Sequence, residues 1–138
     1  MTFEELNKKL GGNEKRTDWR QHPNGLGWLH KSAKVDSTAQ IGPDAIVWGT
    51  VSGNAWVSGN ARVFGDAWVS GNARVYGNAR VYGHAQVYGH ARVYGHAQVY
   101  DDAQVYDGAQ VYDDAQIYGH ARVKSPLFVV GSRNCLSQ

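Results

Sequence analysis

A six-residue alternation of small, apolar and polar positions dominates the chain. Between Gly53 and Lys124, twelve consecutive hexads have alanine at the third position and valine or isoleucine at the fifth. The fourth position is Trp, Arg or Gln, and the sixth is mostly Tyr, Ser or Phe. Each hexad opens with Gly or Asp followed by Asn, Asp, His or Gly. Weaker copies precede this series over residues 27–47, and a last copy follows at 127–129.

Each hexad predicts a four-residue strand followed by a two-residue corner. Alternation by two sends the alanine and the branched residue to one side of the strand and the other two residues to the opposite side. The corner residues tolerate left-handed backbone angles. Because so short a strand cannot bury a face alone, we expect the chain to coil and stack each strand on its copy. Ala and Val side chains then fill the interior, and any ligand must bind outside it, at an end or between subunits.

These hexads resemble the hexapeptide-repeat family of left-handed parallel β-helices, over residues 27–130. That family includes acyltransferases of the lipid A and sugar-nucleotide type and the γ-class carbonic anhydrases. The resemblance implies an all-β fold, a single-stranded triangular solenoid with three hexads per left-handed coil and about six coils in all. The regular hexads also resemble those of short repeat proteins from bacteria and their phages.

Residues 1–26 are predicted to form an N-terminal helix and capping segment. Thr2 and Glu5 fit a capping box, and a short amphipathic helix is expected over about residues 3–10. The open end of a solenoid needs a cap, so Trp19 or Trp28 is expected to pack on the first coil.

The other end of the repeat is predicted to close with larger side chains. Leu127 and Phe128 stand where the repeat has alanine and its neighbour, which indicates a terminal plug. Residues 131–138 are interpreted as a loose tail, in which Cys135 has no chemical role.

Residues 49–54 break the register of the repeat. When the repeat is counted by its alanines, residues 49–54 all lie between Trp48 and Ala55. This is four residues more than a normal corner. One interpretation is a shortened strand around Val51 or a small bulge. The other is a protruding loop flanked by Trp48 and Trp56.

Coils of 18 residues predict that the outward side chains stack in columns. One column holds Tyr76, Tyr94 and Tyr112, and another holds Phe64, Tyr82, Tyr100 and Tyr118. A third contains Ser70, Tyr88, Tyr106 and Lys124. These ladders can be purely structural, but exposed Tyr and Arg are also typical of interfaces. The candidate ligand-binding or interface residues are Arg74, Tyr76, Arg80, Tyr82, Arg92, Tyr94, His84, His90 and His96.

Charge is sorted along the predicted axis. Arg62, Arg74, Arg80 and Arg92 lie in the earlier coils, and five aspartates between residues 101 and 114 lie in the later ones. These are either solvated corners or complementary belts that favour an antiparallel or staggered contact between molecules.

Composition excludes several classes of protein. With 138 residues the chain is one domain, and its formal charge of +2 is too small to indicate nucleic acid. One cysteine excludes an internal disulfide framework. No apolar run reaches the length of a membrane span, and the first residues lack the apolar core of a signal peptide. We therefore expect a cytoplasmic protein without a membrane partner.

The histidines do not predict a metal site within one chain. His84, His90 and His96 are six residues apart and so fall on three different corners, while Asp66, His84, Asp102 and His120 share one corner. No catalytic residue and no cofactor are predicted.

The sequence thus favours a non-catalytic, oligomeric binding or scaffold protein. Its Tyr, Arg and His faces, or grooves between subunits, are expected to recognise a protein partner or an anionic, nucleotide-like small molecule. By the family resemblance the expected homo-oligomer is a trimer. The alternative is a small trimeric enzyme, acyltransferase-like or γ-carbonic-anhydrase-like, with its site at the subunit interface.

Overall fold

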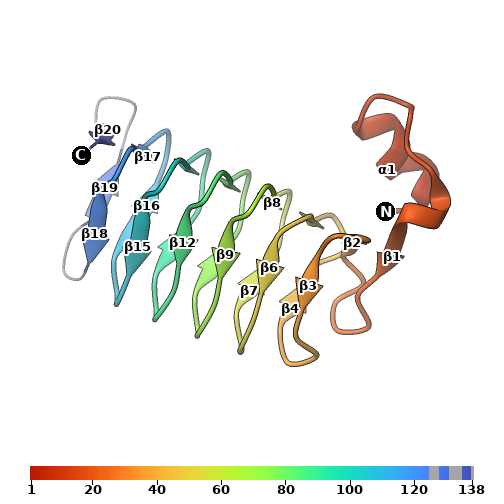
Figure 1. Cartoon of the computed structure of the whole chain (residues 1–138), viewed down its shortest axis with the longest axis horizontal. Helices are drawn as coiled ribbons and strands as arrows, with labels where there is room; N and C mark the ends of the chain where they lie inside the picture. Colours follow the sequence, from red (N-terminus) through yellow and green to blue (C-terminus); the bar gives the residue numbers. More distant parts are fainter. Residues whose placement is uncertain (125–127, 131–134, 138) are drawn as a thin grey trace.

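The computed structural model describes residues 1–124, 128–130 and 135–137. The chain winds into a β-solenoid of three sheets around one axis, with a helical segment at the N-terminal end (Figure 1). Sheet A contains β1 (Trp19–Gln21), β2 (Trp28–His30), β5 (Ile46–Val47), β8 (Arg62–Val63), β11 (Arg80–Val81), β14 (Gln98–Val99), β17 (Gln116–Tyr118) and β20 (Cys135–Ser137). Sheet B contains β3 (Lys34–Val35), β6 (Thr50–Val51), β9 (Trp68–Val69), β12 (Gln86–Val87), β15 (Gln104–Tyr106) and β18 (Arg122–Lys124). Sheet C contains β4 (Gln40–Ile41), β7 (Trp56–Val57), β10 (Arg74–Val75), β13 (Arg92–Val93), β16 (Gln110–Tyr112) and β19 (Phe128–Val130).

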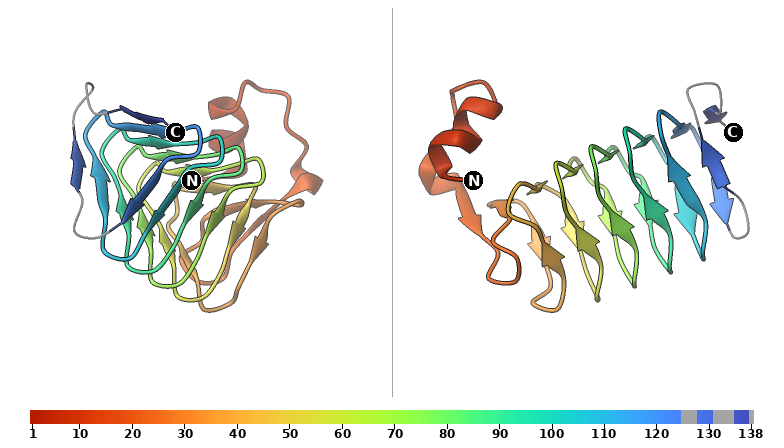
Figure 2. Two further views of the ribbon diagram at one scale, coloured as in Figure 1. Left: turned by 60° about the vertical axis from the view of Figure 1, so that its left-hand side comes forward. Right: turned by 180° about the vertical axis from the view of Figure 1, so that it is seen from behind.

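From β2 onward, successive strands visit the three sheets in turn, so each strand pairs with the third one after it. The pairing is parallel, and along most of the solenoid it joins residues 18 apart, as between Arg74 and Arg92. Three hexads therefore make one coil, as the family resemblance implies. Sheets B and C each have six strands, which makes five full turns from the first strand to the last. Figure 2 shows the coils stacked along the axis from two further directions.

The regular strands span two or three residues, fewer than the four expected from the hexad. Hydrogen bonds between coils nevertheless continue past the ends of the strands. The amide of Tyr76 donates to the carbonyl of Val93 at 2.9 Å, and the amide of Asn78 donates to that of Gly95 at 2.7 Å. The corners are thus held by the same ladder as the sheets.

The interior of the solenoid is one apolar cluster, which runs from Leu29 to Val123. The hexad alanines and branched residues from Ala55 to Ile117 have no exposed surface. This confirms that the repeat directs them inward.

The N-terminal helix α1 (Phe3–Lys9) begins with the predicted capping box. The hydroxyl oxygen of Thr2 accepts from the amide of Glu5, and the Glu5 carboxylate accepts from the amide of Thr2. Leu6 is fully buried in a second apolar cluster with Trp19, Trp28 and Ile46. Because Trp28 and Ile46 are outward residues of sheet A, α1 packs on the outside of that sheet.

Residues 16–33 cover the first edge of sheets A and C. After the short 3-10 helix η1 (Arg16–Asp18), β1 pairs antiparallel with β2 on sheet A. On sheet C, the amide of Gly27 donates to the carbonyl of Ile41 at 2.9 Å, and the Ile41 amide donates to that of Asn24 at 3.0 Å. Next to sheet B, the guanidinium of Arg20 donates to the carbonyl of Ala33 at 3.2 Å. These bonds protect the first coil from pairing with another strand.

The C-terminal expectations meet the structure only in part. Cys135 was expected in a loose tail, but it begins β20, which pairs in parallel with β17. Of the predicted plug, Leu127 lies outside the described residues, and Phe128 is described only as part of the β19 backbone. In the part of the chain that the structure describes, no helix has the length and apolar character needed to cross a membrane.

Candidate ligand-binding groove

The break in the repeat at residues 49–54 is a shortened coil. Thr50 and Val51 form β6, which pairs with β3 and β9 in sheet B. Across this coil, paired residues are 16 apart instead of 18, as between Ile46 and Arg62. A strand around Val51 is confirmed, but it is as long as its neighbours, and the coil is short because the corner before it is missing; the protruding loop is wrong.

Gly49 takes the place of the repeat alanine in this coil. Its carbonyl accepts from the amide of Lys34 at 3.1 Å, as the carbonyl of Ala91 accepts from the amide of Arg74 at 2.9 Å. Trp48, an outer aromatic residue, is therefore followed directly by the inner position, and the two corner residues are missing. A Cβ at Gly49 would lie 2.6 Å from the carbonyl oxygen of Ala67, so the tight passage requires glycine.

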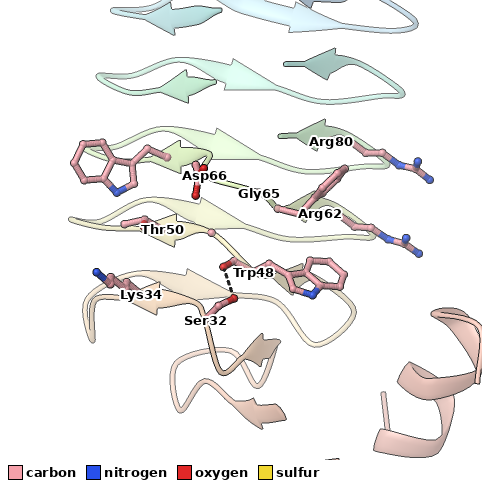
Figure 3. A pocket seen from close by; sticks show the side chains of 11 residues that line it. Ser32, Lys34, Trp48, Thr50, Arg62, Gly65, Asp66 and Arg80 are labelled. Atoms are coloured by element: carbon pink, nitrogen blue, oxygen red, sulfur yellow. Dashed lines mark hydrogen bonds between the residues drawn. The ribbon is translucent and has the colours of Figure 1, made fainter. Parts of the chain in front are cut away.

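The missing corner opens a groove of about 900 Å³ on the edge between sheets A and B. The intact corners of the neighbouring coils, at Ser32 and at Gly65–Asp66, form its two ends (Figure 3). At the Ser32 end, the hydroxyl of Ser32 donates to the carbonyl of Trp48 at 3.1 Å. The groove is lined by Ser32, Lys34, Trp48, Gly49, Thr50, Arg62, Phe64, Gly65, Asp66, Trp68 and Arg80.

Aromatic rings supply the apolar part of the groove. Trp48 packs edge-on against Trp19 at 5.3 Å and against Phe64 at 6.1 Å. Phe64 in turn stacks on Tyr82 at 4.7 Å with nearly parallel rings. These contacts fix the walls, whereas Trp68 on the sheet B side remains 50% exposed. An exposed indole beside a groove is available to a planar ligand.

Three cationic side chains line the groove against one carboxylate. Arg62 and Arg80 extend from sheet A on one side of the opening, and Lys34 lies on the other (Figure 3). Burial lowers the pKa of Arg62 below its ordinary value, and the neighbouring charge of Arg80 lowers it further. The two guanidinium groups therefore repel one another, and a bound anion between them would relieve that repulsion.

Asp66 carries the negative charge of the groove and also contacts the next coil. Its Oδ2 lies 3.7 Å from Nδ1 of His84, and both side chains are largely exposed. The same contact recurs two coils later between Asp102 and His120, at 3.6 Å. The predicted corner column of alternating Asp and His is thus present.

The structure separates most of the candidate residues predicted from the sequence. Arg80 lines the groove, and Tyr82 lies next to it on sheet A. Four candidates lie on sheet C, away from the groove: Arg74, Tyr76, Arg92 and Tyr94. His84, His90 and His96 are exposed on three different corners. Among the described residues, no three His, Cys, Asp or Glu side chains gather closely enough to hold a metal ion.

The predicted tyrosine columns are present, and each column is a parallel stack. Ring centroids lie 4.8 Å apart between Tyr76 and Tyr94, and 5.1 Å apart between Tyr88 and Tyr106. The hydroxyls of Tyr82, Tyr88, Tyr94 and Tyr100 donate to the side-chain carbonyls of Gln98, Gln104, Gln110 and Gln116, respectively. Burial raises the pKa of Tyr82, Tyr88 and Tyr94. These columns therefore stabilise the outer faces between coils.

Sequence reasoning missed most of the groove. It did not single out Lys34, Trp48, Arg62, Phe64 or Trp68 as one site. The available signal was the spacing between Val47 and Val51, which is four residues where the repeat has six.

The repeat and the three parallel sheets define this chain as a β-solenoid repeat protein. Its repeats are similar to the YdcK beta solenoid repeat, whose family model matches residues 55–71, 73–84, 85–96, 97–113 and 115–124. In the comparisons with curated proteins and with solved structures, nothing matched the chain. The matched segments begin after the shortened coil, so Trp48, Gly49 and Thr50 lie outside the repeats that the family model describes.

Proposed function

We propose that this chain is a non-catalytic binding protein whose ligand is a small planar anion, nucleotide-like in having a ring and a negatively charged group. The observation that supports this proposal is the missing corner between Trp48 and Gly49, beside which Arg62 and Arg80 are held close together. The ring of the ligand stacks on the exposed indole of Trp68, and its anionic group lies near the guanidinium groups.

The contacts around the groove support binding by a preformed site. The Ser32–Trp48 hydrogen bond and the aromatic contacts of Trp48 fix one side before any ligand arrives. Preformed sites lose less conformational entropy on binding and therefore bind more tightly for the same contacts. Guanidinium groups suit phosphate and carboxylate because they donate two parallel hydrogen bonds.

The same proposal includes a relationship to the hexapeptide-repeat proteins of bacteria and their phages. It also includes a cytoplasmic location. The relationship rests on the likeness of the hexads between Gly53 and Lys124 to those of that family, and the location rests on the lack of a membrane-length apolar run and of a signal-peptide core in the sequence.

The test uses three probes that separate the ring from the charge: adenosine, inorganic phosphate and AMP. Titrations by calorimetry and by tryptophan fluorescence should give tighter binding of AMP than of either fragment. Arg62→Ala and Arg80→Ala should each weaken AMP binding by about tenfold, which corresponds to the loss of a charge-assisted hydrogen bond. Arg122→Ala, on the last described strand of sheet B, is the matched control and should leave the affinity unchanged.

Two results would contradict the proposal. One is the absence of AMP binding to the folded wild-type chain, with the same result for other nucleoside monophosphates. The other is binding that Arg62→Ala and Arg122→Ala weaken equally, since a general effect of positive charge does not depend on the groove.

A further inference from the structure

The outer surface of sheet C carries aromatic and basic side chains that the cap and the groove leave uncovered. We call this surface the outer C face; it consists of Trp56, Arg74, Tyr76, Arg92, Tyr94, Gln110 and Tyr112. Helix α1 packs on sheet A, and the groove lies on the edge between sheets A and B. Trp56 is 40% exposed, and the guanidinium of Arg74 lies 5.0 Å from the centre of its ring.

Charge on this face changes from positive on β10 and β13 to negative at the corner before β16. Arg74 and Arg92 project from the adjacent strands β10 and β13. The next strand, β16, has Gln110 at the same position and follows the corner that contains Asp107. Arg92 and Asp107 are both exposed; Arg92 is the first residue of β13, and Asp107 lies three residues before β16, on the corner toward which the beginnings of both strands point.

We propose that a second copy of this chain docks on the outer C face with its axis antiparallel, about a two-fold axis between β13 and β16. A two-fold axis that lies in the plane of contact and runs parallel to the strands reverses the order of the coils but keeps the beginning of each strand on the same side. The long side chain of Arg92 then extends along β16 of the partner subunit toward the corner that contains Asp107 of the partner subunit, and Asp107 meets Arg92 of the partner subunit in the same way. One symmetric contact thus makes two opposite-charge pairs.

The tyrosine column matches the same arrangement. Tyr94 and Tyr112 stack at 5.0 Å within the chain, in the same two coils as Arg92 and Asp107. The two-fold axis places Tyr94 against Tyr112 of the partner subunit, so rings meet rings at the centre while charges pair beside them. Tyrosine and arginine are the residue types most often central to protein interfaces.

A parallel arrangement fits this face less well. If the two axes run in the same direction at equal height, the strands of the two copies run in opposite directions, and the corner at Asp107 meets the corner at Asp113 and Asp114 of the partner subunit. Like charges opposed across an interface are unfavourable, and they select against that partner orientation. The charge pattern on the outer C face therefore favours the antiparallel dimer over the parallel one.

The test is a charge exchange measured by sedimentation equilibrium at low ionic strength. The wild-type chain should sediment at twice its mass of 15.2 kDa, with a dissociation constant that rises with salt. Arg92→Glu and Asp107→Lys should each raise this constant by at least about tenfold. An equimolar mixture of the two variants should recover the dimer, because Glu then faces Lys and Asp107 faces Arg92.

Arg122→Glu is the matched control, since it makes the same charge change on sheet B and should leave the dimer intact. Asp107 has a positive φ of 55°, a conformation in which lysine is strained. Circular dichroism must therefore first show that D107K is folded. If it is not, the double-mutant cycle of Arg92→Gln with Asp107→Asn replaces the mixture, and the two losses should be less than additive.

Three outcomes would overturn the proposal. They are a wild-type monomer at every concentration, a wild-type trimer, and a dimer that neither Arg92→Glu nor Asp107→Lys weakens. A folded mixture that stays monomeric, or strictly additive losses in the cycle, would equally show that Arg92 and Asp107 do not meet. None of these results bears on AMP binding in the groove, so the two proposals can fail separately.

Discussion

The hydroxyl of Tyr82 donates a 2.9 Å hydrogen bond to the side-chain carbonyl of Gln98 in the next coil. The same bond joins Tyr88 to Gln104 and Tyr94 to Gln110 at 3.1 Å, so it recurs on all three sheets. Each bond ties an outer residue of one coil to the coil above it. The outer faces thus add side-chain contacts to the backbone ladder.

Tyr82→Phe should lower the free energy of unfolding by about 0.5–1 kcal/mol, because it removes one partly buried hydrogen bond but keeps the stacked ring. Urea unfolding followed by circular dichroism measures the loss. Tyr76→Phe is the control, because Tyr76 stacks in the same way and, within the described residues, its hydroxyl makes no side-chain hydrogen bond. Equal losses in the two variants would mean that the bond to glutamine contributes nothing.

Stability should fall as the pH rises above the ordinary tyrosine pKa of about 10. The pKa of Tyr82, Tyr88 and Tyr94 is raised in the folded state by burial. The folded state therefore binds these protons more tightly than the unfolded state. This contribution is fully present below the unfolded pKa and disappears as the pH passes through the folded pKa. The urea midpoint, measured at a series of pH values, should drop more steeply in the wild type than in a triple Tyr→Phe variant.

Gly77→Ala should destabilise the solenoid by about 1–2 kcal/mol, the cost of placing an alanine in a left-handed conformation. Gly77 has a φ of 68°, and a Cβ there would approach the amide nitrogen of Gly95 to 2.9 Å. Asn78→Ala, at the second residue of the same corner, should cost much less. Thermal melts of the two variants compare them directly, and similar melting temperatures would refute the argument.

Inserting Gly-Asn between Trp48 and Gly49, together with Gly49→Ala, completes the shortened hexad. We expect a folded protein with unchanged far-ultraviolet circular dichroism, because the insertion supplies the corner found in the other coils. AMP binding should be lost, because the new corner fills the groove. The control adds Gly-Asn between Gly71 and Asn72, at a regular corner away from the groove, and should retain binding. Binding that survives the first insertion would place the ligand elsewhere.

The outer columns were predictable because they follow from the six-residue period together with the three hexads per coil that the family resemblance implies. Once a coil has 18 residues, Phe64 must stack on Tyr82, and the two rings lie 4.7 Å apart. The inward direction of Ala and Val follows from alternation in the same way. Prediction succeeded wherever the length of the hexad and of the coil fixed the geometry.

The groove was not predicted because the repeat was counted from its alanines. Gly49 occupies an alanine position without being alanine, so the count assigned extra residues to a coil that in fact lacks two. The position of α1 is indicated in the sequence by Trp28 and Ile46, which are apolar where the repeat is usually polar. Both are buried beneath the helix. The burial of His22, whose Nε2 lies 2.9 Å from the carbonyl oxygen of Ala39, depends on how the capping loop folds, and no periodicity encodes that.

The short passage at Gly49 lies in the second layer of strands, close to the N-terminal cap and far from the last layer. Each layer touches only the layers directly before and after it, so a whole turn can be removed from or added to the distal half without altering the walls around Trp48. Recognition and molecular length are therefore independent properties of this architecture. A lineage carrying it can lengthen or shorten the rod by duplication or loss of 18-residue units and keep the same recognition chemistry.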